Sequence, residues 1–331
     1  MDTVTNRLRT LSYQNQNLID SGLVSGVFTD GSSVHITLEK HPLANLEDLE
    51  KQIQNVLSDL GREVHISVVT IVPKIPYVNR IISVMAGKGG VGKSTISFHL
   101  GKELARHGFR VGLLDADISG PSVPQMTRSY QKPEIDVTLG KILPNQISWS
   151  NDYETLNGVF MSLGLLVPQG ASIALRGPMV HHALKQMLFD VVWGTTDQPL
   201  DCLIVDMPPG TNDTHLSLLK MAKPDDVILV STPDTLSLID VERTIHMLNK
   251  TNTSIAGIIE NMSYFKCQHC NHDSAVFNRD TVASFAEKFQ IPFLGIIPID
   301  VRMRHNDSTM PRYMRSICQQ INGVLSDVCA E

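Results

Sequence analysis

The sequence predicts an α/β protein whose mainly parallel sheet is flanked by helices and preceded by a small α/β domain. The main observation is a series of short apolar runs separated by helix-length segments, a pattern typical of parallel strands joined by helices. These runs are residues 81–86, 111–114, 159–163, 203–205, 227–230, 255–259 and 293–297. The second observation is a shorter, separate set of elements that precedes a proline-containing segment. The length of 331 residues suits about two domains.

The small leading domain is predicted within residues 1–72. Residues 22–28, 34–38 and 64–72 are strand-like, and a polar turn joins the first two. Between the second and third strands, apolar residues recur at three- and four-residue steps and predict a helix. They are Leu46, Leu49, Ile53, Val56 and Leu60. Gly61 follows at the position where a left-handed residue ends a helix.

The domain boundary is predicted from prolines. Pro73 and Pro76 interrupt regular structure, so we place a linker at residues 73–79. The second domain then covers residues 80–331, and it contains every motif described below.

The composition excludes several classes of protein. Hydrophobic residues make up 42% and charged residues 19% of the chain, which is typical of a globular protein. The formal net charge is −6, so no basic surplus favours binding to nucleic acid. No apolar run approaches the roughly 18 residues of a membrane span, and the start of the chain lacks a secretory pattern. The number of cysteines is odd, 5, and we expect a protein of the reducing cytoplasm. From the charge and the short apolar runs we expect no nucleic-acid and no membrane partners.

A phosphate-binding loop is predicted between the first apolar run of the second domain and a following helix. The pattern G-x-x-x-x-G-K-[ST] is matched by Gly87, Lys88, Gly89, Gly90, Val91, Gly92, Lys93 and Ser94. Glycines let backbone N–H groups surround phosphate oxygens, and the helix N-terminus adds the positive end of its dipole. Lys93 is expected to reach the terminal phosphates, Ser94 to bind Mg²⁺ and Thr95 to donate a further hydrogen bond. Lys88 is a second lysine in the loop, which indicates that one of the two cations serves another site.

Acidic residues end two other predicted strands. Asp206 follows the run 203–205, where a carboxylate that holds Mg²⁺ through water is expected. Asp115 and Asp117 end the run 111–114, and one of these carboxylates is expected to orient the attacking water. Residues 208–211 are interpreted as a switch loop.

A pair of cysteines, Cys267 and Cys270, follows the turn-prone segment 261–263. Two thiolates at this spacing can hold one metal, but tetrahedral zinc and a cubane iron-sulfur cluster need more ligands. The chain has no second CxxC pair. Three interpretations follow: His269 and His272 complete a mononuclear zinc site, two subunits each contribute one pair, or the cysteines are a thiol redox pair.

Several motifs together resemble the Mrp/ApbC family of deviant P-loop ATPases, which are relatives of the nitrogenase iron protein and MinD. The phosphate loop at residues 86–95 is similar to that of the family, and residues 113–122 are similar to its first switch. Arg176-Gly177-Pro178-Met179, Asp206-Met207-Pro208-Pro209-Gly210-Thr211 and Glu260-Asn261-Met262-Ser263-Tyr264-Phe265 follow in the family's order. The resemblance covers about residues 81–311.

The resemblance implies an ATP hydrolase that forms a homodimer and binds ATP, with Mg²⁺, between its two subunits. It implies that Lys88 reaches the partner's nucleotide, while Lys93 acts on the phosphates of its own. Asp117 would activate water. Asn261, together with the segment from Pro298 to Asp300, would contact adenine.

The resemblance also implies the cargo of this ATPase. Cys267 and Cys270 of both subunits would together hold a bridging [4Fe-4S] cluster, because two thiolates per chain become four at a two-fold axis. The cluster would be handed to recipient iron-sulfur apoproteins, and assembly scaffolds are further expected partners.

The sequence departs from the family pattern in its second switch and after the cysteines. Asn212 stands where members usually have Gly, and residues 277–280 replace a Gly-rich stretch. The leading domain is similar to the small α/β domain, associated with iron-sulfur assembly, that precedes the ATPase in many bacterial members. It lacks the cysteine that such domains sometimes carry, so we expect a recruitment or structural module.

Two other functions compete with a cluster carrier. A positioning ATPase of the MinD or ParA kind usually has a basic amphipathic tail or a basic DNA-binding face, whereas residues 319–331 contain no Lys or Arg. An ATPase with a structural zinc between its subunits would hold zinc that resists displacement by cluster assembly. The hypothesis that we carry forward is a slow ATPase coupled to cluster transfer.

Overall fold

The computed structural model divides the chain into two compact units. The smaller contains Met1–Pro73 together with Lys220–Ala222, and the larger contains Lys74–Leu219 and Lys223–Glu331. The structure describes residues 2–13, 16–30, 32–40, 46–70, 73–117, 120–150, 155–166, 177–211, 213–267, 269–270, 272–277, 281–299 and 312–325.

The smaller unit contains a three-stranded sheet and two helices. The strand order is β3 (Val24–Thr29), β4 (Ser33–Lys40), β5 (Glu63–Thr70), with β3 antiparallel and β5 parallel to β4. The helices are α1 (Asp2–Leu8) and α2 (Glu47–Leu57), and the 3-10 turn η1 (Ser58–Leu60) follows α2. A small hairpin is formed by β1 (Ser12–Tyr13) and β2 (Gln16–Asn17).

Side-chain alternation decides which face of this sheet is buried. Val34, Ile36 and Leu38 of β4 point to the same face, are fully buried and join a core cluster with Leu49 of α2. Gly61 takes a left-handed conformation with φ 64° and ends η1. The predicted helix and the first two predicted strands are confirmed, as is the third as far as residue 70; residues 71–72 lie outside the described residues.

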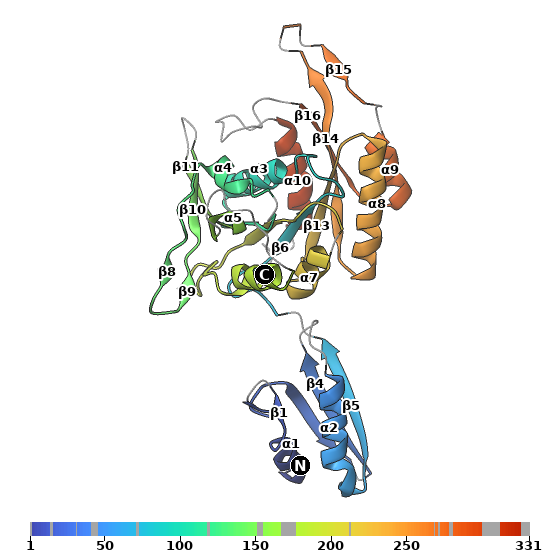
Figure 1. Cartoon of the computed structure of the whole chain (residues 1–331). Coiled ribbons are helices and arrows are strands. Elements are labelled where there is room, and N and C mark those ends of the chain that lie inside the picture. The colour runs from blue at the N-terminus through green and yellow to red at the C-terminus, as the bar shows by residue number, and fades with distance from the viewer. Residues whose placement is uncertain are drawn as a thin grey trace. The chain divides into compact units, whose positions relative to one another are not determined.

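The larger unit is built on a nine-stranded sheet (Figure 1). Its order is β10-β11-β7-β12-β6-β13-β14-β15, and β16 also pairs with β14. The strands are β6 (Ile81–Met85), β7 (Val111–Asp115), β10 (Asn145–Ser150), β11 (Thr155–Ser162), β12 (Cys202–Asp206), β13 (Asp226–Ser231), β14 (Ile255–Lys266), β15 (Asp273–Ala275) and β16 (Phe293–Ile299). Only β10 with β11 and β14 with β15 pair antiparallel within it. The predicted parallel sheet is therefore confirmed, with all seven predicted strands present.

Helices lie on both sides of this sheet, with α3 and α10 on one side and α7 and α8 on the other (Figure 1). The helices are α3 (Lys93–Arg106), α4 (Val123–Thr127), α5 (Leu163–Leu166), α6 (Gly177–Phe189), α7 (Asp213–Met221), α8 (Thr235–Lys250), α9 (Thr281–Phe289) and α10 (Arg312–Leu325). Every residue of β7, β12 and β13 is buried, as expected for strands covered on both faces. A two-stranded hairpin of β8 (Ile135–Asp136) and β9 (Lys141–Ile142) completes the unit. None of the described helices is long and apolar enough to cross a membrane.

The structure gives the local conformation of two segments that the sequence marks as irregular. Residues 261–263 are expected to turn, but β14 runs through them, with a local irregularity at which Met262 takes a φ of 57° and the register with β16 shifts. Residues 74–79 fall within the expected linker, yet Leu200 N donates to Tyr77 O at 2.8 Å and Asn79 N donates to Leu200 O at 2.9 Å. The end of that segment is therefore hydrogen-bonded to Leu200, two residues before β12, within the larger unit.

The core of the larger unit gives a test of the fold. Phe160 of β11 is fully buried in the cluster that contains Trp149. Phe160→Ala should lower the free energy of unfolding by about 3–5 kcal/mol, because it leaves a cavity. Urea unfolding followed by tryptophan fluorescence measures this, since both Trp149 and Trp193 lie in the larger unit.

Val137→Ala is the matched control, because Val137 is 92% exposed and its loss should change the free energy by less than about 0.5 kcal/mol. Equal effects of the two substitutions would contradict the assignment of Phe160 to the core.

Candidate functional site

The predicted phosphate loop connects β6 to α3, and close packing explains two of its glycines, Gly87 and Gly92. A Cβ at Gly87 would lie 2.3 Å from the carbonyl carbon of Asp240, and one at Gly92 would lie 2.2 Å from Nδ2 of Asn261. Gly92 also has φ 88° and stands directly before the first residue of α3. The loop therefore brings backbone N–H groups to a helix N-terminus, where an anion is favoured.

A buried ion pair joins the end of this loop to the end of β12. Lys93 Nζ lies 2.6 Å from Asp206 Oδ1, and the two side chains are 6% and 0% exposed. Ser97 Oγ donates to the same oxygen at 3.1 Å. The second carboxylate oxygen, Asp206 Oδ2, is buried and has no hydrogen-bond partner among the described residues. A buried acceptor without a partner is rare, and it fits a position that water bound to a cation would fill.

Asp115 lies beside Asp206, because the two residues are paired in register at the ends of β7 and β12. Asp115 is fully buried, and its Oδ2 accepts from Ser162 Oγ at 3.0 Å and from the backbone N–H groups of Ser122 and Val123 at 3.0 and 3.1 Å. Burial, followed by the charge of Asp206, raises the pKa of Asp115 to about 7. The side-chain carboxyl groups of Asp115 and Asp206 therefore lie together in a buried environment at the C-terminal ends of β7 and β12.

Asp117 and Lys88 lie nearer to solvent than this buried centre. Asp117 is half-buried just after β7, and its Oδ1 accepts from Gly120 N at 3.2 Å. Lys88 is exposed on the loop, with Nζ 3.6 Å from Oδ2 of Asp234, the residue that caps α8. The two lysines of the loop therefore have different surroundings, one buried against β12 and the other at the surface.

The predicted switch loop is held to β6 and to α7. Gly210 N donates to Ala86 O at 3.2 Å, directly before the phosphate loop. His215 of α7 is fully buried, and its Nε2 lies 2.7 Å from Pro208 O. These contacts connect the phosphate loop, the switch loop and α7. Asn212 lies outside the described residues.

Asn261 of β14 contacts the phosphate loop from the other side, because its Nδ2 donates to Val91 O at 2.7 Å. Pro298 is buried on β16, next to Ile297, which pairs with Asn261. The structure thus brings Asn261 and Pro298 to adjacent strands beside the loop. Asp300, expected with them, and Arg176 of the earlier motif lie outside the described residues.

The cysteine pair follows the last residue of β14. Cys267 is half-buried and Cys270 exposed, and neither forms a disulfide within the described part of the chain. The backbone N–H groups of Cys270 and His269 lower the pKa of Cys267, which favours the thiolate that binds metals. No group of three or more potential metal ligands is assembled among the described residues. Of the three interpretations of the cysteine pair, the mononuclear zinc site with His269 and His272 therefore has no assembled ligand set among those residues.

Three polar side chains of this centre were not predicted from the sequence: Ser97, Ser162 and His215. Ser97 had a usable signal, because it lies four residues after Lys93 and hence on the same face of α3. Ser162 and His215 contact residues brought near by the tertiary fold, so no local pattern marks them.

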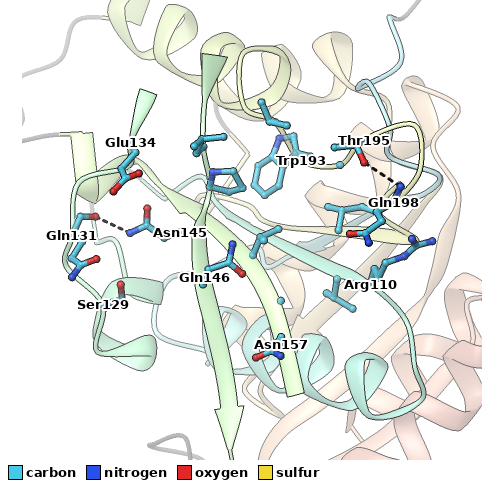
Figure 2. Close-up of a pocket in the computed structure, with 18 of the residues that line it drawn as sticks. Arg110, Ser129, Gln131, Glu134, Asn145, Gln146, Asn157, Trp193, Thr195 and Gln198 are labelled. Atoms are coloured by element: carbon cyan, nitrogen blue, oxygen red, sulfur yellow. Dashed lines mark hydrogen bonds between the residues drawn. The ribbon is translucent and has the colours of Figure 1, made fainter. Parts of the chain in front are cut away.

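A separate cavity of about 750 Å³ opens at the start of β7 and along β10 and β11 (Figure 2). Amide side chains are prominent in its lining, namely Gln131, Asn145, Gln146, Asn157 and Gln198, and Trp193 lies among them. None of the predicted site residues lines it. The phosphate loop and the cysteines are therefore distinct from this cavity.

The surroundings of Asp115 predict a pH effect on stability. An Asp in an unfolded chain has a pKa of about 3.9, whereas the folded, nucleotide-free protein raises the pKa of Asp115 to about 7. Between these values the folded state holds the extra proton, so the contribution of Asp115 to stability falls as pH rises from about 4 to about 7 and is constant above. Asp115→Asn should remove up to about 1.4 kcal/mol per pH unit of this decline.

Urea unfolding of the parent and of D115N at several pH values, without nucleotide, measures the difference in slope. Parallel stability curves for the two proteins between pH 4 and 7 would contradict a buried, protonated Asp115.

Comparisons with known proteins agree with this arrangement. A family model described as ParA, NUBPL iron-transfer P-loop NTPase, matches residues 77–331. An iron-sulfur cluster carrier protein of Deinococcus radiodurans is 33% identical, over 96% of this chain and 95% of its own length. The cytosolic Fe-S cluster assembly factor CFD1 of Candida albicans is 40% identical, over 69% of this chain and 81% of its own.

Solved structures give the same fold. A nucleotide-binding protein of Archaeoglobus fulgidus, in complex with ADP, superposes with a TM-score of 0.61 at 31% identity, over 72% of this chain and 92% of that one. The cell division ATPase MinD of Pyrococcus furiosus has a TM-score of 0.51 at 19% identity, over 74% and 99%, which shows a shared fold alone. With the phosphate loop, the buried Lys93–Asp206 pair and these matches, the chain belongs to the NUBPL-type iron-transfer P-loop NTPases, a family with the MinD/ParA-like fold that includes the iron-sulfur cluster carrier proteins.

Proposed function

We propose that this chain is an ATP-binding and ATP-hydrolysing carrier that holds a [4Fe-4S] cluster between two copies and transfers it to recipient apoproteins. The main support for this proposal is the path of strand β14. Its Asn261 contacts the phosphate loop, and its last residue directly precedes Cys267. One strand therefore joins the place for the nucleotide to the place for the metal.

The nucleotide phosphates would be bound by the loop N–H groups and by Lys93. Ser94, at the first turn of α3, and Asp206, with its unpartnered Oδ2, are the residues that would hold Mg²⁺. Bound there, Mg²⁺ would neutralise charge on the phosphates. The fit is chemical, because a hydroxyl and a carboxylate are oxygen donors of the kind that Mg²⁺ prefers.

Nucleotide binding requires Lys93 to change its partner. Lys93 is paired with Asp206 in the structure, and it must turn from the carboxylate to reach a phosphate. Leaving Asp206 alone would be costly, because a buried charge without a partner is strongly destabilising. We therefore expect phosphate and Mg²⁺ to be bound together, since each replaces one member of the pair.

Hydrolysis is assigned to Asp117 and Lys88. Asp117 is half-buried close to the buried carboxylates, where it would orient the attacking water. Lys88 is exposed and serves no group of the buried centre, which supports a role toward the nucleotide of a second subunit. Asn261 and Pro298, on adjacent strands, are proposed to contact the adenine, with Asp300 as a third expected contact.

The cluster is proposed to be cargo held by Cys267 and Cys270 of two chains. A cubane cluster takes four thiolates, and the sequence offers one pair in each chain, so a two-fold dimer supplies the full set. The lowered pKa of Cys267 favours ligation, and exposure of Cys270 leaves a route for transfer. Relatives named as cytosolic and as mitochondrial are both similar to this chain, and a reducing compartment such as the expected cytoplasm suits the free thiols.

The smaller unit is proposed to be the domain associated with iron-sulfur assembly that the sequence predicts for residues 1–72. No cysteine occurs in it. This supports a role in recruitment or structure rather than in a second cluster site.

The different surroundings of Lys93 and Lys88 predict that substitution of the first weakens nucleotide binding and substitution of the second slows hydrolysis. Lys93→Ala should weaken MgATP binding by roughly 10- to 100-fold, because it removes charge-assisted hydrogen bonds to phosphate. Lys88→Ala should leave the Kd of the isolated chain nearly unchanged and lower kcat by about 100-fold, the usual effect of losing one transition-state charge contact. Calorimetry and phosphate release measure the two quantities.

Lys250→Ala, at an exposed lysine on the last turn of α8, is the matched control and should match the parent in both assays. Turnover by the Lys88→Ala protein equal to that of the parent would remove its proposed role.

The cysteines predict a cluster that depends on both thiols. After anaerobic reconstitution with iron and sulfide, the parent should show visible cluster absorption and about two irons per chain, and Cys267→Ala with Cys270→Ala should abolish both. His269→Ala with His272→Ala is the matched control in the same segment, and it should retain the cluster.

An unchanged spectrum in the cysteine variant would overturn the cluster assignment. Stoichiometric zinc that resists cluster assembly would instead favour a structural metal between the subunits.

A further inference from the structure

The cavity beside β10 and β11 lies on one face of the large sheet. Its volume of about 750 Å³ is within the range of known ligand sites. Gln146 of β10 and Val159 of β11 are paired in register and both line the cavity. On the opposite face of β10, Ile147 and Trp149 are buried, and Trp149 packs against Phe98 of α3. The cavity therefore lies on the face of these strands that is turned away from α3.

The lining of this cavity is rich in side-chain amides that are available for hydrogen bonds. In the part of the chain that the structure describes, the side chains of Gln146, Asn157 and Gln198 hydrogen-bond no other residue. Figure 2 shows Gln131 to one side of Gln146, and Trp193 and Gln198 to the other. Each amide group offers both donors and an acceptor. A ligand in the cavity would therefore meet donors and acceptors on both sides.

The charges around the cavity balance each other. Arg110 is paired with Asp201, with its Nη2 3.4 Å from Oδ1. Lys132 and Glu134, two residues apart in the lining, carry opposite charges. Selection of an ionic ligand needs a complementary charge of one sign. The lining therefore suits a ligand without net charge.

The aromatic residue of the cavity does not offer a stacking surface. Trp193 is only 3% exposed, and its Nε1 donates to Met187 O at 3.0 Å. Proteins that bind nucleobases by stacking present an open aromatic face. Hydrogen bonding, and not stacking, is therefore the chemistry that this cavity offers to a ligand.

The strand β10 that lines the cavity is also the edge of the large sheet. No strand other than β11 pairs with β10 in the described part of the chain. Edge strands are usually protected from pairing with another chain by charged residues, proline or a bulge. The sequence of β10 is Asn-Gln-Ile-Ser-Trp-Ser, without charge or proline, and its register with β11 is regular over all six residues. This edge therefore lacks the usual protection against an added strand.

We propose that the cavity and the edge of β10 together bind an extended, uncharged peptide segment of a partner protein. The backbone of the segment pairs with β10, and every second side chain enters the cavity. Amide and hydroxyl side chains fit best, because they match the hydrogen-bonding groups of Gln146 and Gln198 and bring no charge. This binding function is separate from the phosphate loop and from the cysteines, so it does not depend on the proposed cluster.

A random peptide library displayed on phage tests the site on the full-length chain. The parent should select uncharged sequences rich in Asn, Gln, Ser and Thr. A synthetic peptide of a selected sequence should change the fluorescence of Trp193, which lines the cavity, and a titration then gives its Kd. Gln146→Ala with Gln198→Ala should weaken binding by at least tenfold, as expected for two lost hydrogen bonds.

Gln319→Ala with Gln320→Ala is the matched control, because these two glutamines are exposed on α10 and do not line the cavity. It should bind the peptide as tightly as the parent. Urea unfolding curves equal to that of the parent show that each variant is folded.

Methylation of single backbone nitrogens in the selected peptide tests the addition of a strand. In a strand, successive N–H groups point alternately toward a neighbouring strand and away from it. Methylation at every second nitrogen should therefore weaken binding by at least tenfold, while methylation at the nitrogens between them should leave the Kd unchanged.

Three results would overturn the inference. The parent could select no peptide, or only strongly charged ones. The selected peptide could bind the Gln146→Ala, Gln198→Ala protein as tightly as the parent. The effect of methylation could fail to alternate along the peptide. Each of these results leaves the proposed function intact, because none of them concerns nucleotide or cluster binding.

Discussion

The buried ion pair between Lys93 and Asp206 is the constraint on which the site depends. Lys93 is the first residue of α3 and Asp206 is the last of β12, so their 2.6 Å contact fixes the helix start against the strand end. Neither charge can be left alone in this enclosed place without a large penalty. The charged form of Asp115 is disfavoured in the same buried environment, because burial and Asp206 together raise its pKa to about 7. Phosphate for Lys93 and a cation for Asp206 are the replacements that we propose for the two members of the pair.

The phosphate loop is connected to the cysteine segment by one side-chain hydrogen bond and by strand β14. The loop that ends at Lys93 accepts a hydrogen bond from Asn261 at Val91 O, and Asn261 lies on the strand that ends just before Cys267. On the other side, Gly210 ties the switch loop to the strand before the phosphate loop. The phosphate loop therefore has two direct contacts, one with the switch loop and one with β14. The end of β14 is where two chains are proposed to share a cluster.

Much of the fold could be predicted, because the buried parallel strands are continuous apolar runs with a local signal. The phosphate loop could be predicted too, since its glycines are required by a positive φ and by backbone packing at Gly92 and Gly87. The contacts that tune the centre could not. Ser162 and His215 act on residues that the tertiary fold brings near, and no residue pattern indicates that β14 continues past Met262, whose φ is 57°. The pairing of Asp115 with Asp206 likewise follows from strand order, which the runs alone do not give.

In the proposed function two chains make one metal centre, and each chain gives a single pair of thiolates. Native mass spectrometry of the anaerobically reconstituted protein tests it most directly, because it counts chains and bound atoms on the same particle. We expect one species with two chains, four irons and four sulfides, in keeping with four thiolates for one cubane. A single chain that carries iron by itself would contradict this expectation. A particle that remains a dimer but holds no iron would contradict it as well.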